Sequence, residues 1–255
     1  MKPFRIIYLA IVFLYLYIPL AVMVANSFNV NKYGMRWDGF TLQWFSAMLQ
    51  NHSLMEATRN SLLVAISSAT VATVLGGLGA TCIYLYRFRG RKVIQVTLLT
   101  IMMIPDIILA IGLLVLFVIT GVSLGFWSLL LAHVTFCLPF VTVTVLARLQ
   151  GFDPNLIDAA KDLGASESQT TRHIVIPLLK PALLASWLLS FTLSLDDVIV
   201  SSFVTGPSFD VLPLKLFSMV KVGVKPEVNA LSTLFVGISV VLILICHYLT
   251  KENKR

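Results

Sequence analysis

The chain has 255 residues, of which 58% are hydrophobic and only 12% are charged, and its mean hydropathy is +0.90. This composition excludes a water-soluble globular protein, and also the disordered, collagenous and disulfide-scaffold classes. Several uncharged stretches reach about 20 residues, the length that crosses a bilayer as an α-helix. The composition therefore predicts an integral membrane protein.

Six apolar stretches predict an all-α membrane domain that extends over residues 1–255. Of the 19 basic and 12 acidic residues, only Asp106, Asp196 and Asp197 fall inside these stretches. Such segregation is expected, because a charge at the centre of a membrane helix costs about 2.5 to 3.5 kcal/mol on insertion scales. The predicted spans are residues 6–28, 61–86, 93–119, 127–147, 182–204 and 231–250.

The distribution of basic residues predicts the orientation of these spans. On the side that holds both termini lie 13 Lys and Arg residues, against 6 on the other side. By the positive-inside rule both termini are cytoplasmic, and the net charge of +7 needs no nucleic-acid partner. The first span is longer than a signal-peptide core and no small-residue cleavage site follows it, so we expect it to remain as a helix.

Local patterns predict further elements on the outer side. A short interfacial helix is expected after Thr41, and Ser53 with Glu56 forms a capping-box pattern that would start the second membrane helix near Leu54. An amphipathic helix is expected over Leu212–Val222, and Pro226 suits the first turn of the last helix. These segments would form the outer face of the protein.

Small residues recur at every fourth position of the second span, which indicates a face for close helix packing. They are Ser68, Ala72, Gly76 and Ala80. The chain contains no phosphate-binding loop of the G-x-x-x-x-G-K-[ST] type, so it has no evident means of using ATP itself. Its cysteines and histidines are scattered without ligand-type spacing, and no metal site is predicted.

The longest cytoplasmic segment, residues 148–181, has the pattern of two short helices. Asp153 and Pro154 would start the first helix and Gly164 would close it. Ser166 and Gln169 form a capping box for a second helix that runs towards Ile176. In the first helix an apolar ridge is expected on a solvated loop, so another protein should cover it. The ridge consists of Leu156, Ile157, Ala160 and Leu163.

The spacing in this loop resembles the E-A-A-x3-G-x9-I-x-L-P motif of permease subunits in bacterial ABC importers. Asp158 stands at the Glu position and Ile176 at the Leu position, and the remaining residues match. The resemblance implies an ABC type I importer fold, in which residues 155–163 dock on a cytoplasmic ATPase subunit. The residues to which it assigns this coupling are Asp158, Ala159, Ala160, Leu163, Gly164, Ile174 and Pro177.

The three aspartates inside the spans are candidates for a solute pathway, because carboxylates at membrane depth need a cation, a proton or a hydrogen-bond network. Asp106 follows Pro105, which is expected to kink its helix. Asp196 and Asp197 point about 100° apart if helical, so one would face the pathway and the other would contact a neighbouring helix or cap a break in its own. A purely local network is the alternative for all three.

Longer stretches are similar to the C-type permeases of spermidine/putrescine ABC importers. They are residues 15–20, 86–90, 125–141, 159–167, 190–208 and 218–231. This resemblance implies a heterodimer with a B-type permease, a dimer of ATPase subunits that use ATP and Mg, and a periplasmic polyamine-binding protein, in a bacterial inner membrane. It implies that this chain binds no cofactor and catalyses no chemical reaction. Carboxylates with Trp187, Phe191 or Phe203 would suit a polycation, although packing is the commoner role of such aromatics.

Three other functions are consistent with parts of the sequence. A permease of the same class could carry another small solute, such as ferric ion or an amino acid derivative. An intramembrane aspartyl protease also carries carboxylates in two spans, but Asp106 and the Asp196–Asp197 pair lack its sequence settings. A secondary cation-coupled transporter would be expected to have an internal inverted repeat, which the sequence does not display.

Overall fold

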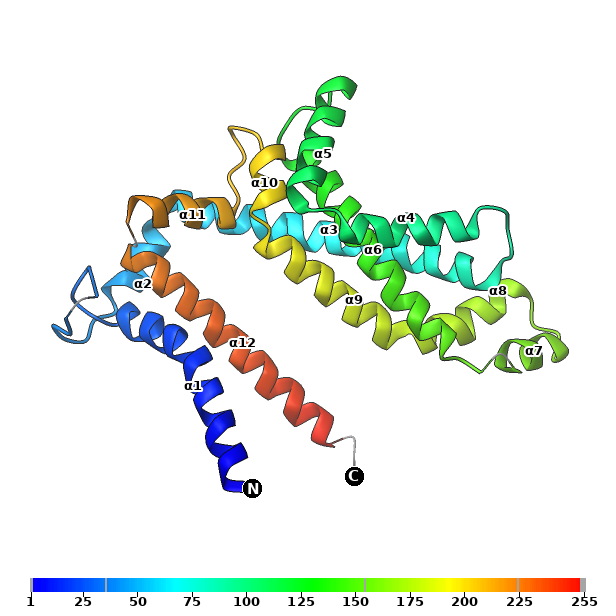
Figure 1. The fold of residues 1–255 in the computed structure, drawn as a ribbon, viewed down its shortest axis with the longest axis horizontal. Helices are drawn as coiled ribbons and strands as arrows, with labels where there is room; N and C mark the ends of the chain where they lie inside the picture. Colours follow the sequence, from blue (N-terminus) through cyan, green and yellow to red (C-terminus); the bar gives the residue numbers. More distant parts are fainter. Residues whose placement is uncertain (1, 35, 154, 224, 253–255) are drawn as a thin grey trace. The chain divides into compact units, whose positions relative to one another are not determined.

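The computed structural model describes residues 2–252 except 35, 154 and 224; for residues 2–4, 157, 158, 161 and 242–252 only the backbone is described. Within these residues the regular elements are all helical, apart from an isolated antiparallel bridge between Asn29 and Phe40 (Figure 1). The predicted all-α class is confirmed. The helices form two compact units, residues 1–55 with 215–255, and residues 56–214.

The first unit contains α1 (Lys2–Ser27), α2 (Gln43–Gln50) and α12 (Pro226–Glu252), and α12 contacts both of the others. The loop between α1 and α2 is ordered by Trp44, whose indole Nε1 donates a hydrogen bond of 2.7 Å to the carbonyl of Asn29. The ring of Phe28 lies 5.4 Å from that of Phe40 and 5.2 Å from that of Phe45. The short helix predicted after Thr41 is confirmed, since α2 begins two residues later at Gln43.

Two boundaries near this unit test the predicted caps. The second long helix, α3 (His52–Leu85), begins earlier than expected, because the side-chain oxygen of Asn51 accepts a hydrogen bond of 3.1 Å from Leu54 N. The predicted Ser53/Glu56 box is thus wrong. In contrast, α11 (Leu212–Val222) and the start of α12 at Pro226 match the prediction, and Gly223 closes α11 with φ of +132°.

The second unit is built around α6 (Phe126–Gln150), which contacts α4 (Arg91–Met103), α5 (Asp106–Thr120), α9 (Ile176–Asp196) and α10 (Ile199–Val204). One apolar cluster joins α5, α6 and α10 through Phe117, Leu129 and Val200, all buried. A second cluster joins α3, α6 and α9. These contacts place α6 at the centre of the unit.

The third predicted span, 93–119, is not one continuous helix. It divides into α4 and α5, whose axes are bent by 111°. Pro105 lacks an N–H and disfavours the α conformation in the preceding residue, and Ile104 accordingly has extended dihedrals of −69° and 131°. The kink expected at the proline is confirmed, as a full break.

The helices around the fifth predicted span, 182–204, differ from the prediction at both ends. Helical structure runs continuously from α8 (Glu167–Thr170) through a π-helix, η1 (Thr171–Val175), into α9, so it does not stop before Pro177. The π-helix lies directly before Ile176 and Pro177. Pro177 cannot donate a backbone hydrogen bond, and the wider π turn accommodates this without ending the helix. At the other end α9 stops at Asp196, and α10 starts at Ile199.

Four of the described helices are long and apolar enough to cross a membrane. They are Arg5–Ser27, His52–Leu85, Phe126–Gln150 and Glu167–Asp196, and the bent pair α4–α5 would make a fifth. The described apolar part of α12, Pro226–Val241, is shorter. The chain is therefore a multi-pass membrane protein by the length and composition of its helices.

The small-residue face of α3 packs against α6, as predicted. Ser68, Ala72 and Ala80 are fully buried, and a Cβ at Gly76 would lie 2.8 Å from the Cβ of Val141.

We expect Gly76→Ala to destabilise the protein by about 1–3 kcal/mol, because the added methyl group overpacks this contact. Gly79→Ala is the matched control on the same helix, since its Cβ would meet nothing within 4 Å. Alanine is the better helix former, so the control should be neutral or slightly stabilising. Thermal unfolding in detergent measures the difference. Equal midpoints for the two variants would contradict the packing assignment.

Candidate functional site

Two helix breaks bring the three membrane aspartates to one cavity. Asp106 is the first residue of α5, just after the bend, whereas Asp196 and Asp197 lie where α9 ends. All three line a cavity of about 350 Å³ together with Phe136, Phe140, Leu193 and Val198–Val200. The contact between α5 and α10 brings the two breaks together. Carboxylates that are 90 residues apart in the sequence thus share one site.

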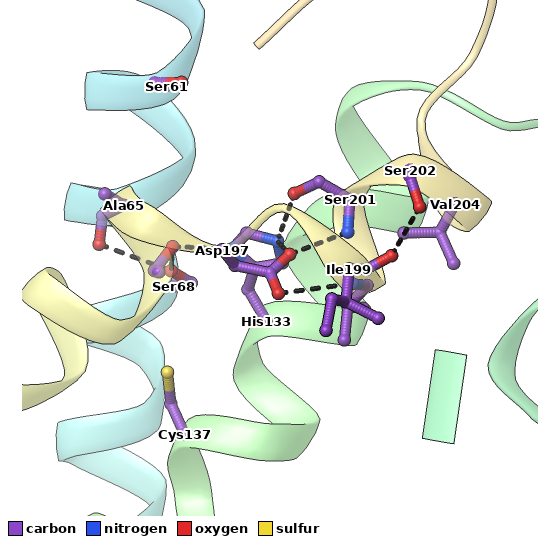
Figure 2. A network of polar contacts seen from close by, with 12 residues as sticks. Ser61, Ala65, Ser68, His133, Cys137, Asp197, Ile199, Ser201, Ser202 and Val204 are labelled. Carbon is purple, nitrogen blue, oxygen red and sulfur yellow. Dashed lines mark hydrogen bonds and ion pairs between the residues drawn. The ribbon is translucent and has the colours of Figure 1, made fainter. Parts of the chain in front are cut away.

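Asp197 holds the first turn of α10. Its Oδ1 accepts a hydrogen bond of 3.2 Å from Val200 N, and its Oδ2 accepts one of 2.7 Å from Ser201 N (Figure 2). The first amides of a helix lack intrahelical partners, and a carboxylate there also complements the positive end of the helix dipole. Asp197 therefore caps a break in its own span, one of the two roles expected for the second aspartate of the pair.

Asp106 and Asp196 are differently placed. Both are exposed, and neither forms a hydrogen bond or ion pair with another residue in the described part of the chain. Asp106 lies at the N-terminus of α5, which favours a negative charge, whereas Asp196 is the last residue of α9, where the helix dipole disfavours one. Asp196 is thus the carboxylate that gains most from an external cation.

The aromatic residues of this cavity are not those considered from the sequence. Phe136 and Phe140 of α6 line it, while Trp187, Phe191 and Phe203 do not. Trp187 donates a hydrogen bond of 3.0 Å from Nε1 to Thr70 Oγ1 and stacks on Phe191, and Phe203 packs against the apolar cluster of α5, α6 and α10. These three residues have packing roles, and a cation-π role would fall to the two phenylalanines.

His133 of α6 is a site residue that spacing rules for metal ligands did not identify. It is almost fully buried, with Nδ1 at 2.6 Å from Ser194 Oγ and Nε2 at 3.2 Å from Ser201 Oγ and 3.6 Å from Asp197 Oδ2. Figure 2 shows this network between α3, α6 and the α9–α10 break. The sequence feature that could have identified His133 is that it is an ionisable side chain inside a predicted span.

The cytoplasmic segment 148–181 has the two predicted short helices. In front of α7 (Asn155–Asp162), Asp153 Oδ1 accepts a hydrogen bond of 3.0 Å from Asn155 N; Pro154 lies outside the described residues. Gly164 closes this helix with φ of +82°. The capping box of α8 is confirmed by bonds of 2.9 Å from Ser166 N to Gln169 Oε1 and 3.3 Å from Gln169 N to Ser166 Oγ.

The expected apolar ridge is only partly exposed. Leu163, just after α7, is 89% exposed and Leu156 is 45% exposed, whereas Ala160 is buried within the chain. The exposure predicted for Ala160 is wrong, because other parts of the same chain already cover this side chain, and α7 contacts α8. Of the other motif residues, Ala159 and Pro177 are exposed and Ile174 is half-buried in η1, while the side chains of Ile157 and Asp158 lie outside the described residues. Among the side chains that the structure describes in this loop, Leu163 is therefore the most accessible apolar group.

Comparison with known proteins agrees with a transport role. The family described as Binding-protein-dependent transport system inner membrane component matches residues 71–251. The chain is 52% identical to the spermidine/putrescine transport system permease protein PotC of Escherichia coli (strain K12), over 97% of this chain and 94% of that protein. It is 38% identical to the putrescine transport system permease protein PotI of the same organism, over 100% and 93%.

Among solved structures, a bacterial ABC transporter involved in the import of the acidic polysaccharide alginate has the same fold. The TM-score is 0.77 at 15% identity, and the match covers 98% of this chain and 95% of that one. These relatives are transport components and not hydrolases, so the protease alternative is rejected and no catalytic role is assigned. The matched region and the identity over nearly the whole chain show that this chain belongs to the family of binding-protein-dependent transport system inner membrane components.

Proposed function

We propose that this chain is a permease subunit of an ATP-driven ABC importer for the polyamines spermidine and putrescine. The single observation that carries the proposal is the cavity at the two helix breaks, where Asp106 and Asp196 present carboxylates that bond no other residue in the described part of the chain. Within the described residues the cavity lining includes no Lys or Arg, so a polyammonium solute would supply the missing positive charge. The relatives named for spermidine and putrescine support the same solute class.

In this proposal the chain crosses the bacterial inner membrane six times with both termini in the cytoplasm. Four of these spans are the long helices. The other two are the bent pair α4–α5, third in chain order, and the helix α12, which is last. Segment 148–181 then faces the cytoplasm. There Leu163 and the helix α7 dock on a dimer of ATPase subunits, which bind the ATP and Mg that this chain does not use.

The partners in the membrane and outside it follow from the same proposal. A second, B-type permease completes the pathway around the cavity, and a periplasmic polyamine-binding protein delivers the solute to the outer side. The family's description as binding-protein-dependent supports the second partner.

Uptake into vesicles that contain the complete complex tests the proposal. We expect labelled spermidine and putrescine to accumulate only when ATP and the cognate binding protein are present, with competition by unlabelled polyamines but not by amino acids or sugars. Full uphill uptake without the ATPase subunits would contradict the proposal and favour a secondary transporter.

A permease for another small solute is the alternative within the same class, because the fold itself also serves importers such as the one for alginate. Competition by a different solute, with polyamines inert, would identify that alternative.

A further inference from the structure

His133 is positioned where three helices meet at the α9–α10 break. It is 1% exposed and lies on α6, between Ser194 of α9 and Ser201 of α10. Ser68 of α3 joins the same network, 3.0 Å from Ser194 Oγ. A buried polar network of this kind is stabilising only when its members are satisfied, so the direction of each hydrogen bond is constrained.

The Asp197 carboxylate determines which ring nitrogen carries the proton. The Ser68 hydroxyl has two acceptors within reach, Ala65 O at 3.3 Å and Ser194 Oγ at 3.0 Å, so the serine hydrogen bonds alone do not determine it. His133 Nε2 faces Ser201 Oγ at 3.2 Å and Asp197 Oδ2 at 3.6 Å, so Nε2 carries the hydrogen and Nδ1 accepts from the Ser194 hydroxyl at 2.6 Å. The opposite tautomer would direct the Nε2 lone pair at a carboxylate oxygen, which is repulsive.

The Asp197 carboxylate is consequently surrounded by donors that belong to the protein. It accepts from the amides of Val200 and Ser201 and faces the N–H of His133. The side chain is only 11% exposed, so little of it remains for a solute. Asp106 and Asp196 in the same cavity have no such donors from other described residues.

We infer that His133 is a positioning residue: it holds Asp197 on the first turn of α10, and this keeps the break in place and leaves Asp106 and Asp196 to bind the cationic solute. The inference rests on the proposed function for the identity of the solute. The division of roles among the three carboxylates goes beyond that proposed function.

Two amide variants separate positioning from mere space filling. In His133→Gln the amide nitrogen reaches the place of Nε2 and can still donate towards Asp197, whereas in His133→Asn it reaches only the place of Nδ1. Cys137→Ala is the control for packing. Cys137 lies one turn further along α6, is fully buried and bonds Ser190 O at 3.6 Å, with no bond to Asp197.

Two measurements on the complete complex test the inference. The first is amide hydrogen exchange of the peptide 198–205, which does not depend on the solute; the second is the KM and maximal rate of spermidine uptake. For His133→Asn we expect exchange to accelerate about tenfold and KM to rise about tenfold at a maximal rate within about twofold, the scale of one lost hydrogen bond to a charged group. His133→Gln should resemble the unchanged protein in both measurements, and Cys137→Ala should leave the exchange unaltered.

Unchanged exchange in His133→Asn would overturn the inference, as would equal acceleration in all three variants. If His133→Asn does not assemble, Ser194→Ala carries the same expectation, since it removes the donor to Nδ1 and leaves the ring in place; unaltered exchange in that variant would also overturn the inference. Accelerated exchange in a complex that never imports spermidine would uphold the positioning role and contradict the proposed solute instead.

Discussion

Asp196→Asn and Asp106→Asn should each lower the efficiency of polyamine uptake, maximal rate over KM, by about tenfold to a hundredfold. A hydrogen bond to a charged group contributes about 1.5–3 kcal/mol, and the amide removes the charge while keeping the shape of the side chain. In the double variant the uptake efficiency should fall by a further factor of similar size. Initial rates of labelled spermidine uptake in vesicles measure the effect.

Stability provides the internal control for this prediction. Neither carboxylate bonds another described residue, so both variants should unfold at the same temperature as the unchanged protein. Asp197→Asn should instead lower stability by about 0.5–2 kcal/mol, because Asp197 caps α10. Glu56→Gln makes the same chemical change at an exposed side chain near the start of α3, outside the cavity, and should leave uptake unaltered. Normal uptake in the Asp106/Asp196 double variant would refute the cation site.

Leu163→Asp should detach the ATPase subunits while the chain still inserts and folds. A fully desolvated apolar anchor at an interface contributes about 2 kcal/mol or more, and a buried unpaired charge adds a further penalty. Since Leu163 is 89% exposed in the isolated chain, its replacement disturbs no internal packing. Copurification of the ATPase with the permease, and ATP hydrolysis by the complex, measure the loss.

Val222→Asp is the matched control for the coupling loop. Val222 is 86% exposed at the end of α11, outside segment 148–181, so the same substitution there should leave the ATPase bound. Ala160 is unsuitable for this test, because it is buried and a bulky replacement there would disrupt packing within the chain. Full retention of the ATPase by Leu163→Asp would argue against docking through this loop.

Local sequence signals predicted most of the helices. Hydrophobic length located α1 and α6 closely, and turn residues located the short ones: Gly223 and Pro226 bound α11 and α12, and Ser166 with Gln169 starts α8. These features depend on nearest neighbours along the chain, such as the missing N–H of proline or a side-chain oxygen within reach of the next turn. The family could be identified for the same reason, since its loop motif is a contiguous pattern.

The site depended on information that periodicity does not contain. Asp106 was identified as a residue after a kink, but a bend of 111° and the contact of α5 with α10 were needed to bring it to the same cavity as Asp196. His133 had no pattern of its own, because its partners Ser194 and Ser201 are more than 60 positions away in the sequence.

The sequence by itself determined that this protein lies in a membrane, roughly where most of its helices run and which loop resembles a coupling segment. Apolar length and the local turn residues set these features, and both are read from contiguous sequence. Only the tertiary structure decided which of the three carboxylates bond other residues and which do not, within the residues that it describes. That distinction depends on where helix ends meet across the unit, and the meeting of α5, α6 and the α9–α10 break satisfies Asp197 while it leaves Asp106 and Asp196 open to the cavity.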